Sequence, residues 1–256
     1  MILTTVLALL SGGLVGFTLG LIGGGGSILA TPLLLYVVGM ADPHLAIGTG
    51  AVAVSANAFM NFGSHARAGT VRWTSALMFA ATGVLGALLG STVGKAFDGQ
   101  RLLILFALLM ILVGVLMLKP RKDAGGAAAP LTFALAARTC GVGLCVGLLS
   151  GFFGIGGGFL IVPGLILATG MPMINAVGTS LFAVGMFGLA TAVNYAFSGL
   201  VDWPVAGEYI AGGVGGGLLG MRAALHLSGQ RRTLTRIFAG IVFVVAFYML
   251  WRSLRG

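Results

Sequence analysis

Apolar residues in this chain run in long, uninterrupted stretches that short polar turns separate. We distinguish eight such segments, at residues 2–39, 45–64, 73–93, 102–118, 131–169, 175–197, 204–221 and 235–251. A helix needs ~20 apolar residues to cross the hydrocarbon core of a bilayer, and such stretches recur along the chain. The alternation of polar and apolar residues that marks a membrane β-strand is absent. The pattern therefore predicts an all-α polytopic membrane protein.

Two segments, 2–39 and 131–169, are much longer than one crossing needs, and each contains a run of glycines. Residues 16–32 read GFTLGLIGGGGSILATP, and residues 147–163 read GLLSGFFGIGGGFLIVP. Glycine in the middle of a helix is unfavourable, so we expect both segments to break at these runs. Either the chain enters and leaves the membrane on the same side, or one arm crosses while the other lies deep within the bundle.

The two glycine runs belong to an ordered series of matches between two parts of the chain. Residues 46–50 read AIGTG, and residues 176–180 read AVGTS. A series of this kind at a nearly constant spacing indicates an internal duplication. We therefore divide the chain into a first transmembrane repeat, a linker and a second transmembrane repeat, at residues 1–118, 119–130 and 131–256.

These paired motifs resemble the TauE/SafE family of membrane proteins, often called sulfite exporters. The resemblance rests on the paired glycine runs, each followed by a proline, and on the paired A-x-G-T-[GS] runs. It covers nearly the whole chain. It implies a multi-pass integral carrier of the bacterial inner membrane, whose expected substrates are small anions such as sulfur oxyanions or organosulfonates.

The distribution of positive charge favours the re-entrant alternative, in which the two long segments enter and leave the membrane on the same side. Lys and Arg concentrate in the cytoplasmic loops of membrane proteins. If both long segments are re-entrant, ten of the 14 Lys and Arg fall on one side of the membrane. The four on the other side are Lys95, Arg101, Arg252 and Arg255. Each half then has an odd number of crossings, so the halves become inverted repeats.

Composition argues against several classes of function. Charged residues make up 7% of the chain, whereas a soluble domain carries ~25%. The net charge of +9 does not indicate nucleic-acid binding, because the Lys and Arg lie almost entirely between apolar segments, where we expect them to contact lipid headgroups. The sequence has no metal-ligand cluster, paired carboxylates, nucleophile motif or P-loop. We therefore expect no enzyme activity, cofactor or metal, and only the lipid bilayer and a small anion as partners.

An anion site in the middle of this chain's helices has to rely on neutral groups, because the charged residues lie at or near the ends of the apolar segments. Unpaired backbone N–H groups at a helix break can bind an anion instead. The candidate residues at the breaks are Gly23, Gly24, Gly25, Gly26, Ser27, Gly154, Gly156, Gly157 and Gly158. The alternative explanation for these glycines is close packing between helices.

Polar residues in the second and sixth segments extend the predicted substrate site. Thr49, Thr179 and Ser180 lie near the starts of these segments, where their hydroxyls either cap a helix or donate to an oxyanion. Asn57 and Asn61 are four residues apart and share one face of a helix. This face must point inward because amides in lipid need partners. The two amides either line the substrate path or hydrogen-bond a neighbouring helix.

Two ionisable residues are candidates for proton coupling. His65 ends the second segment, and histidine changes its charge near neutral pH. Glu208 lies in the first turns of the seventh segment. The alternatives are ordinary interfacial roles, namely a histidine at a helix end and a carboxylate in an ion pair.

Taken together, these features predict a secondary transporter that binds a small anion at two glycine-broken helices near the middle of the membrane. Paired interruptions at corresponding positions of two repeats are typical of transporter binding sites. Two alternatives stay open. One is a passive anion channel through the same glycines, and the other is a membrane scaffold or partner subunit whose glycines serve only packing.

Overall fold

The computed structural model describes residues 2–118, 132–154, 158–226 and 231–255. In these residues the chain is helical apart from short turns and loops. The elements are α1 (Ile2–Ile22), the 3₁₀ helix η1 (Gly24–Leu29), α2 (Ala30–Tyr36), α3 (Pro43–Arg67), α4 (Trp73–Ala96), α5 (Gly99–Leu118), α6 (Phe133–Phe153), α7 (Gly158–Thr169), α8 (Met173–Ala196), α9 (Trp203–His226) and α10 (Arg231–Arg255). The prediction of an all-α fold is confirmed for this part of the chain.

Six of the described helices are long and apolar enough to cross a bilayer, namely α1, α3, α4, α5, α6 and α8. The helices α3 and α8 are the most buried of the six and therefore occupy the centre of the bundle. Many Leu and Val side chains remain exposed on the outer helices. Such a surface suits a protein whose surrounding solvent is lipid rather than water, so the helices form a polytopic membrane bundle.

Both long apolar segments are interrupted at their glycine runs. Segment 2–39 divides into α1, η1 and α2, and segment 131–169 divides into α6 and α7. Gly23 and Gly154 follow the first helix of each segment, with φ angles of +80° and +67°. This region of backbone conformation is open to glycine and strained for other residues, so the helix ends there.

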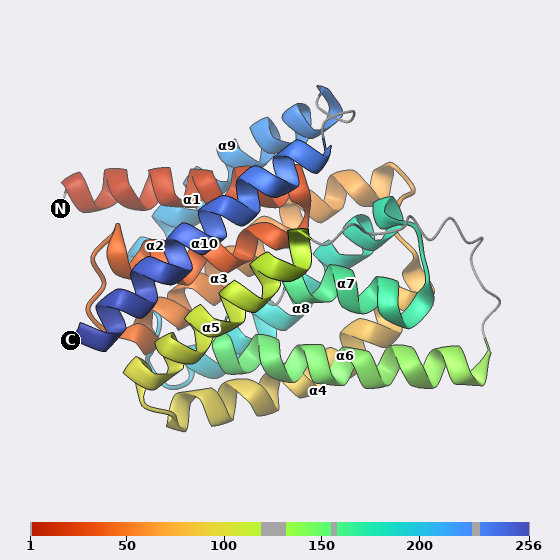
Figure 1. The fold of residues 1–256 in the computed structure, drawn as a ribbon, viewed down its shortest axis with the longest axis horizontal. Coiled ribbons are helices and arrows are strands. Elements are labelled where there is room, and N and C mark those ends of the chain that lie inside the picture. Colours follow the sequence, from red (N-terminus) through yellow and green to blue (C-terminus); the bar gives the residue numbers. More distant parts are fainter. Residues whose placement is uncertain (1, 119–131, 155–157, 227–230, 256) are drawn as a thin grey trace.

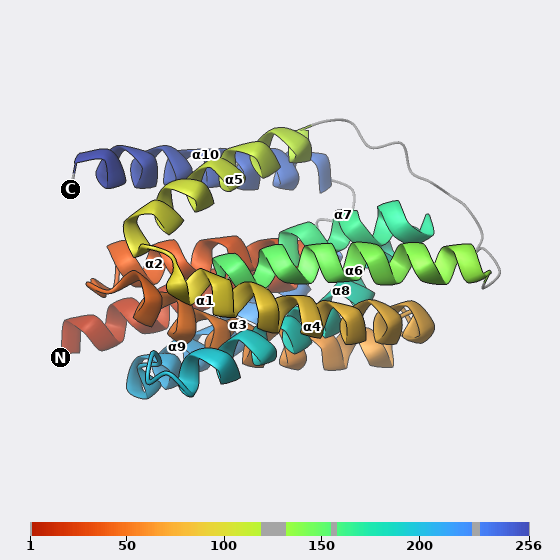
Figure 2. The same cartoon turned by 90° about the horizontal axis from the view of Figure 1, so that it is seen from below.

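The helices run roughly along the long axis of the molecule, and both termini lie at one end of it (Figures 1 and 2). We call this the termini end. From there α1 runs toward the opposite end and α2 runs back, so that residues 37–42 return to the termini end. The pair of α6 and α7 has the reverse course, because α6 runs toward the termini end and α7 runs away from it.

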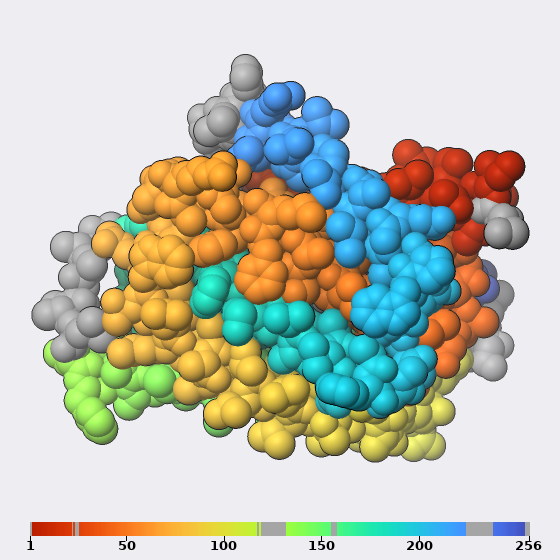
Figure 3. Space-filling view, turned by 180° about the vertical axis from the view of Figure 1, so that it is seen from behind, coloured from red at the N-terminus to blue at the C-terminus, as the bar shows by residue number. Residues whose placement is uncertain are grey.

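The first helix of each repeat packs against a helix of the other repeat. Helix α1 lies along α9, α6 lies along α4, and α3 packs against α8 in the centre. Helices α5 and α10 form a pair on one side of the bundle (Figure 2). On the face drawn in Figure 3, orange and yellow segments of the first repeat lie beside cyan and blue segments of the second. The two halves of the chain are therefore interlocked.

Glycines permit the closest of these contacts, because small residues let the backbones of membrane helices approach each other. The glycines of α1 whose Cβ would overlap the backbone of α9 are Gly12, Gly16 and Gly20. Their counterparts in α6, which face the backbone of α4, are Gly143, Gly147 and Gly151. The same contact therefore occurs twice, once for each repeat.

Candidate functional site

At the first break, glycine backbone packs directly against the neighbouring helices. A Cβ on Gly23 would lie 2.6 Å from the Val177 side chain of α8. Gly24 and Gly25 begin η1, and a Cβ on Gly26 would overlap Thr18 of α1. Ser27 is fully buried. No larger side chain fits at Gly23 or Gly26 without a shift of the neighbouring helices.

At the second break, Gly154 has surroundings like those of Gly23. A Cβ on Gly154 would overlap the side chain of Ile47 in α3, which occupies the place in the first repeat that Val177 occupies in the second. Gly158 begins α7 and is buried. The predicted site residues Gly156 and Gly157 lie outside the described residues. Each break is thus covered by an aliphatic side chain from the central helix of the other repeat.

The two broken segments meet inside the bundle. The 3₁₀ helix η1 contacts α7, and it also contacts the central helix α8. Helix α2 packs against α3, and α7 packs against α8. The two segments that contain the glycine runs therefore lie next to each other and next to the central helices α3 and α8.

Thr49 and Thr179 are buried, and each accepts a backbone hydrogen bond from the other repeat. The N–H of Asp202 donates to Thr49 Oγ1 at 2.9 Å, and the N–H of Arg72 donates to Thr179 Oγ1 at 3.0 Å. Asp202 and Arg72 directly precede α9 and α4. Since the N–H groups at a helix start lack partners within the helix, each threonine satisfies one group at the start of a helix. Ser180 instead donates to the carbonyl of Val177 within α8, at 2.8 Å.

Asn57 and Asn61 face α9 from the middle and the second half of α3. The Asn61 amide donates to the Asn57 carbonyl at 2.9 Å, and a Cβ on Gly217 would lie 2.8 Å from Asn61 Nδ2. Asn57 is fully buried and directly faces Gly213. Neither its amide nitrogen nor its side-chain oxygen has a hydrogen-bond partner among the described residues. The inward orientation that the sequence predicts for this face is confirmed.

Two further polar residues, Tyr209 and Thr31, lie beside the first break and are not among the site residues predicted from the sequence. Tyr209 of α9 is fully buried, and its hydroxyl donates to the carbonyl of Ala30 at 3.4 Å. Thr31 is buried and its hydroxyl has no partner among the described residues. A comparison of the repeats contained a signal for Tyr209, because the corresponding residue of the first repeat is Phe79.

The two candidates for proton coupling lie far apart along the bundle. His65 is near the end of α3, where its Nδ1 lies 3.2 Å from Thr70 Oγ1. Glu208 lies near the start of α9 and accepts a hydrogen bond of 2.7 Å from Thr5 Oγ1. The structure therefore does not combine these two residues into one site. Within the described ranges, no group of three or more His, Cys, Asp and Glu side chains could hold a metal.

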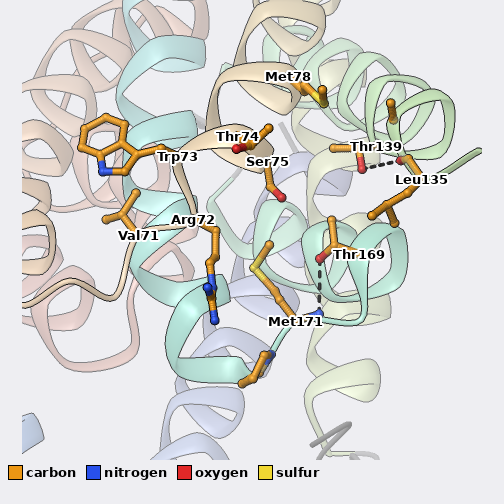
Figure 4. Close-up of a pocket in the computed structure, with 12 residues that line it drawn as sticks. Val71, Arg72, Trp73, Thr74, Ser75, Met78, Leu135, Thr139, Thr169 and Met171 are labelled. Atoms are coloured by element: carbon orange, nitrogen blue, oxygen red, sulfur yellow. Dashed lines mark hydrogen bonds between the residues drawn. The ribbon is translucent and has the colours of Figure 1, made fainter. Parts of the chain in front are cut away.

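A cleft of about 310 Å³ lies at the opposite end of the bundle, between the starts of α4 and α6 and the end of α7. Figure 4 shows Arg72 and Ser75 of the first repeat at this cleft, together with Thr139 and Thr169 of the second. The cleft contains none of the predicted site residues. The described part of the bundle is thus hollowed at the end opposite the termini.

The chain is similar to a known protein family and to several probable membrane transporter proteins. The chain matches the family described as "Sulfite exporter TauE/SafE" over residues 8–249. A probable membrane transporter protein of Xylella fastidiosa is 59% identical over 244 residues, which cover 95% of this chain and 94% of the relative. The probable membrane transporter protein YunE of Bacillus subtilis is 29% identical over 267 residues, which cover 94% of this chain and 96% of the relative.

No solved structure matches the chain significantly. The family match nevertheless spans both glycine breaks, both buried threonines and the central helices. The resemblance that the paired motifs indicate is therefore confirmed: this chain belongs to the sulfite exporter TauE/SafE family of membrane transporters.

Proposed function

We propose that this protein is a secondary transporter of small anions, in particular sulfur oxyanions or organosulfonates, and that the anion binds at the two glycine breaks. The observation that carries this proposal is the contact between the two broken segments inside the bundle. Helix breaks that meet at the interface of two repeats expose backbone donors away from the membrane surface. Successive N–H groups of glycine-rich backbone can bind an anion without a formal positive charge.

We also propose that the two repeats have inverted topology and that the long segments are re-entrant. Corresponding helices run in opposite directions, as α1 and α6 do in Figure 1. Lys95, Arg101 and Arg252 belong to helix ends at the termini end, whereas Arg67, Arg72 and Arg138 belong to helix ends at the opposite end. Because positive loops stay in the cytoplasm, we assign the opposite end to the cytoplasmic side of a bacterial inner membrane.

The packing suggests that the parts of the protein that move together during transport are not the two sequence repeats, but pairs of helices taken from both repeats. Glycine contacts bring the backbone of α1 close to that of α9, and those of α6 close to that of α4. Tightly packed interfaces change in discrete steps rather than by continuous sliding. In the transport cycle that we propose, α1 moves with α9 and α6 moves with α4, while the central pair of α3 and α8 holds the breaks.

Exchange of labelled anions across proteoliposomes containing the purified protein tests this function. Gly23→Ala and Gly154→Ala place a methyl group against Val177 and Ile47, so we expect both variants to lose exchange. The matched controls are Gly39→Ala and Gly170→Ala, because these glycines also have positive φ angles but nothing within 4 Å of the added methyl group. The controls should retain exchange.

The result also separates the alternatives. Exchange that is stimulated by anion on the far side indicates a carrier, whereas steady single-channel currents would indicate a passive channel. If no anion crosses the membrane with the wild-type protein, the proposal fails and the scaffold alternative gains support. If Gly23→Ala and Gly154→Ala transport as well as their controls, transport does not depend on the breaks. On this proposal the protein is not an enzyme, and its partners are the bilayer and the anion.

A further inference from the structure

Asn57 occupies a position that is energetically unfavourable in the absence of a ligand. It lies near the midpoint of α3 (Pro43–Arg67) and is fully buried. Both polar atoms of its amide lack a hydrogen-bond partner among the described residues. A buried amide without hydrogen-bond partners destabilises a folded protein. The residue is thus a buried polar group near the middle of a helix long enough to span a membrane, and the closed bundle leaves its amide without a hydrogen-bond partner.

Tyr209 and Thr31 belong to α9 and α2, two helices that pack against α3. Asn57 faces Gly213 of α9, and Tyr209 is one helical turn before Gly213 on the same face. The Tyr209 hydroxyl reaches the Ala30 carbonyl of α2 only at 3.4 Å, which is long for an O–H donor. Thr31 follows Ala30, and its hydroxyl lacks a partner in the described structure. Weakly satisfied polar groups from α2, α3 and α9 therefore lie beside the first break, with Ala30 and Thr31 next to Gly50, about two helical turns before Asn57 on the same face of α3.

The positions that correspond to Asn57 and Tyr209 in the other repeat are occupied by aromatic apolar side chains. Phe187 stands where the first repeat has Asn57, and Phe79 stands where the second repeat has Tyr209. Their rings stack with centroids 5.9 Å apart and an angle of 13° between the planes. Phe187 also covers Gly83, as Asn57 covers Gly213. At these positions, polar side chains beside the first break correspond to a stacked pair of phenylalanines.

We infer that Asn57, Tyr209 and Thr31 form a ligand-binding place beside the first glycine break, and that it takes an oxyanion with one negative charge. The inference rests on the proposed transport function and narrows its substrate class. The amide and the two hydroxyls can each donate a hydrogen bond to a sulfonate, hydrogensulfite or carboxylate group. The stacked phenylalanines of the counterpart offer no such group.

The preference for a single charge follows from the positions of the cations in the described helices. Every Lys and Arg of the described helices lies within two turns of a helix end. Removing an ion from water is costly, and the cost rises steeply with its charge. Neutral donors can offset this cost for a monoanion, whereas a dianion such as sulfate would need a buried Lys or Arg beside it.

In this conformation the binding place is closed. The Asn57 amide lies directly against Gly213, so an anion enters when α9 separates from α3. Helix α9 is packed against α1 through glycine contacts, so the two helices would move away from α3 together. The hydrogen bonds that Asn57 lacks in the closed bundle would then be supplied by the anion.

Exchange assays in proteoliposomes test the inference with Asn57→Leu and Tyr209→Phe. The matched controls are Phe187→Leu and Phe79→Leu, which alter the counterpart positions of the other repeat. We expect each of the first two variants to lower methanesulfonate exchange at least about tenfold, the equivalent of one hydrogen bond. The controls should stay within about threefold of the wild type, a change of less than one such bond.

A stability measurement separates a binding role from a packing role. Leucine has nearly the shape of asparagine and carries no polar atom, so Asn57→Leu should unfold at an equal or higher temperature than the wild type. A stable variant without exchange supports the inference. An Asn57→Leu variant that exchanges methanesulfonate like the wild type would overturn it, and so would equal losses in the Phe187→Leu control.

The anion series tests the charge preference separately. The wild type should exchange methanesulfonate but not sulfate, and it should exchange sulfite faster at a pH where hydrogensulfite dominates. Sulfate exchange at the rate of methanesulfonate would overturn the preference for one charge, although the transport function would stand. A wild-type protein that exchanges none of these anions would instead contradict the proposed function itself.

Discussion

Gly16 of α1 packs so closely against Gly213 of α9 that a methyl group on Gly16 would overlap the Gly213 carbonyl oxygen. The same relationship joins Gly147 of α6 to Gly83 of α4. Each contact links a helix of one repeat to a helix of the other, so neither repeat can fold into its final arrangement alone. These contacts also define which helices we expect to move as one unit during transport.

The first prediction concerns this contact. Gly16→Ala should lower the unfolding temperature by several degrees, because overpacking a tight contact costs about 1–3 kcal/mol. Gly13→Ala is its control on the same helix, since a methyl group there would lie 3.6 Å from the nearest atom, an ordinary contact distance. Alanine also favours a helix over glycine by about 1 kcal/mol. Equal unfolding temperatures for the two variants in a thermal scan would show that the α1–α9 contact is not tight.

The second prediction separates a structural role of Thr49 and Thr179 from ligand binding. Thr49→Val and Thr179→Val remove the acceptors of the Asp202 and Arg72 N–H groups. We expect each to destabilise the protein by about 1–2 kcal/mol, as the loss of a helix cap does. Thr49→Ser and Thr179→Ser should restore stability because serine keeps the oxygen. Valine variants with wild-type unfolding temperatures but no anion exchange would instead assign these hydroxyls to the ligand.

The third prediction concerns a polar cluster at the termini end. Lys95 Nζ donates to the carbonyl and the side-chain oxygen of Asn194, at 2.9 and 2.8 Å, and to Ser198 Oγ at 2.7 Å. These bonds join the ends of α4 and α8. Lys95→Met should therefore lower stability by about 1 kcal/mol or more, and Asn194→Leu should do the same. Arg101→Met, which removes an exposed cation at the same end, should leave the thermal scan unchanged.

The sequence was sufficient to predict the broken segments, because two observations agreed there. Gly23 and Gly154 occupy corresponding places in the duplication, and each lies within an apolar stretch too long for one crossing. Local preference and segment length together predict a break at such glycines. The structure adds the reason that a larger residue is excluded, since Val177 and Ile47 fill the space that a side chain would need.

The partners of the polar residues could not be predicted in the same way. The spacing of Asn57 and Asn61 indicates a shared face but not the helix that this face contacts. Similarly, Thr49 lies 153 residues from Asp202, whose N–H it accepts, and no local pattern links them. Such pairs depend on which helices become neighbours in the interlocked bundle. Tyr209 could have been found by aligning the two repeats residue by residue. In that alignment Asn57 corresponds to Phe187, and Tyr209 corresponds to Phe79.

The last prediction tests the re-entrant topology. In a background where Cys140 and Cys145 are replaced by alanine, Ala41→Cys and Ala68→Cys introduce single thiols at exposed positions. Ala41 lies between α2 and α3 at the termini end, and Ala68 lies between α3 and α4 at the opposite end. Because Lys and Arg concentrate at the opposite end, an impermeant maleimide should label intact cells at position 41 and reach position 68 only after permeabilisation.

A tag at the N-terminus gives the second half of this experiment. If the first long segment is re-entrant, the tag and position 41 lie on the same side of the membrane, and a protease added outside removes the tag from intact cells. If the segment instead crosses once, the tag is protected while position 41 is labelled. Labelling of position 68 in intact cells, with position 41 protected, would keep the re-entrant topology and reverse the orientation. The two readouts therefore test the path of the chain and its direction independently.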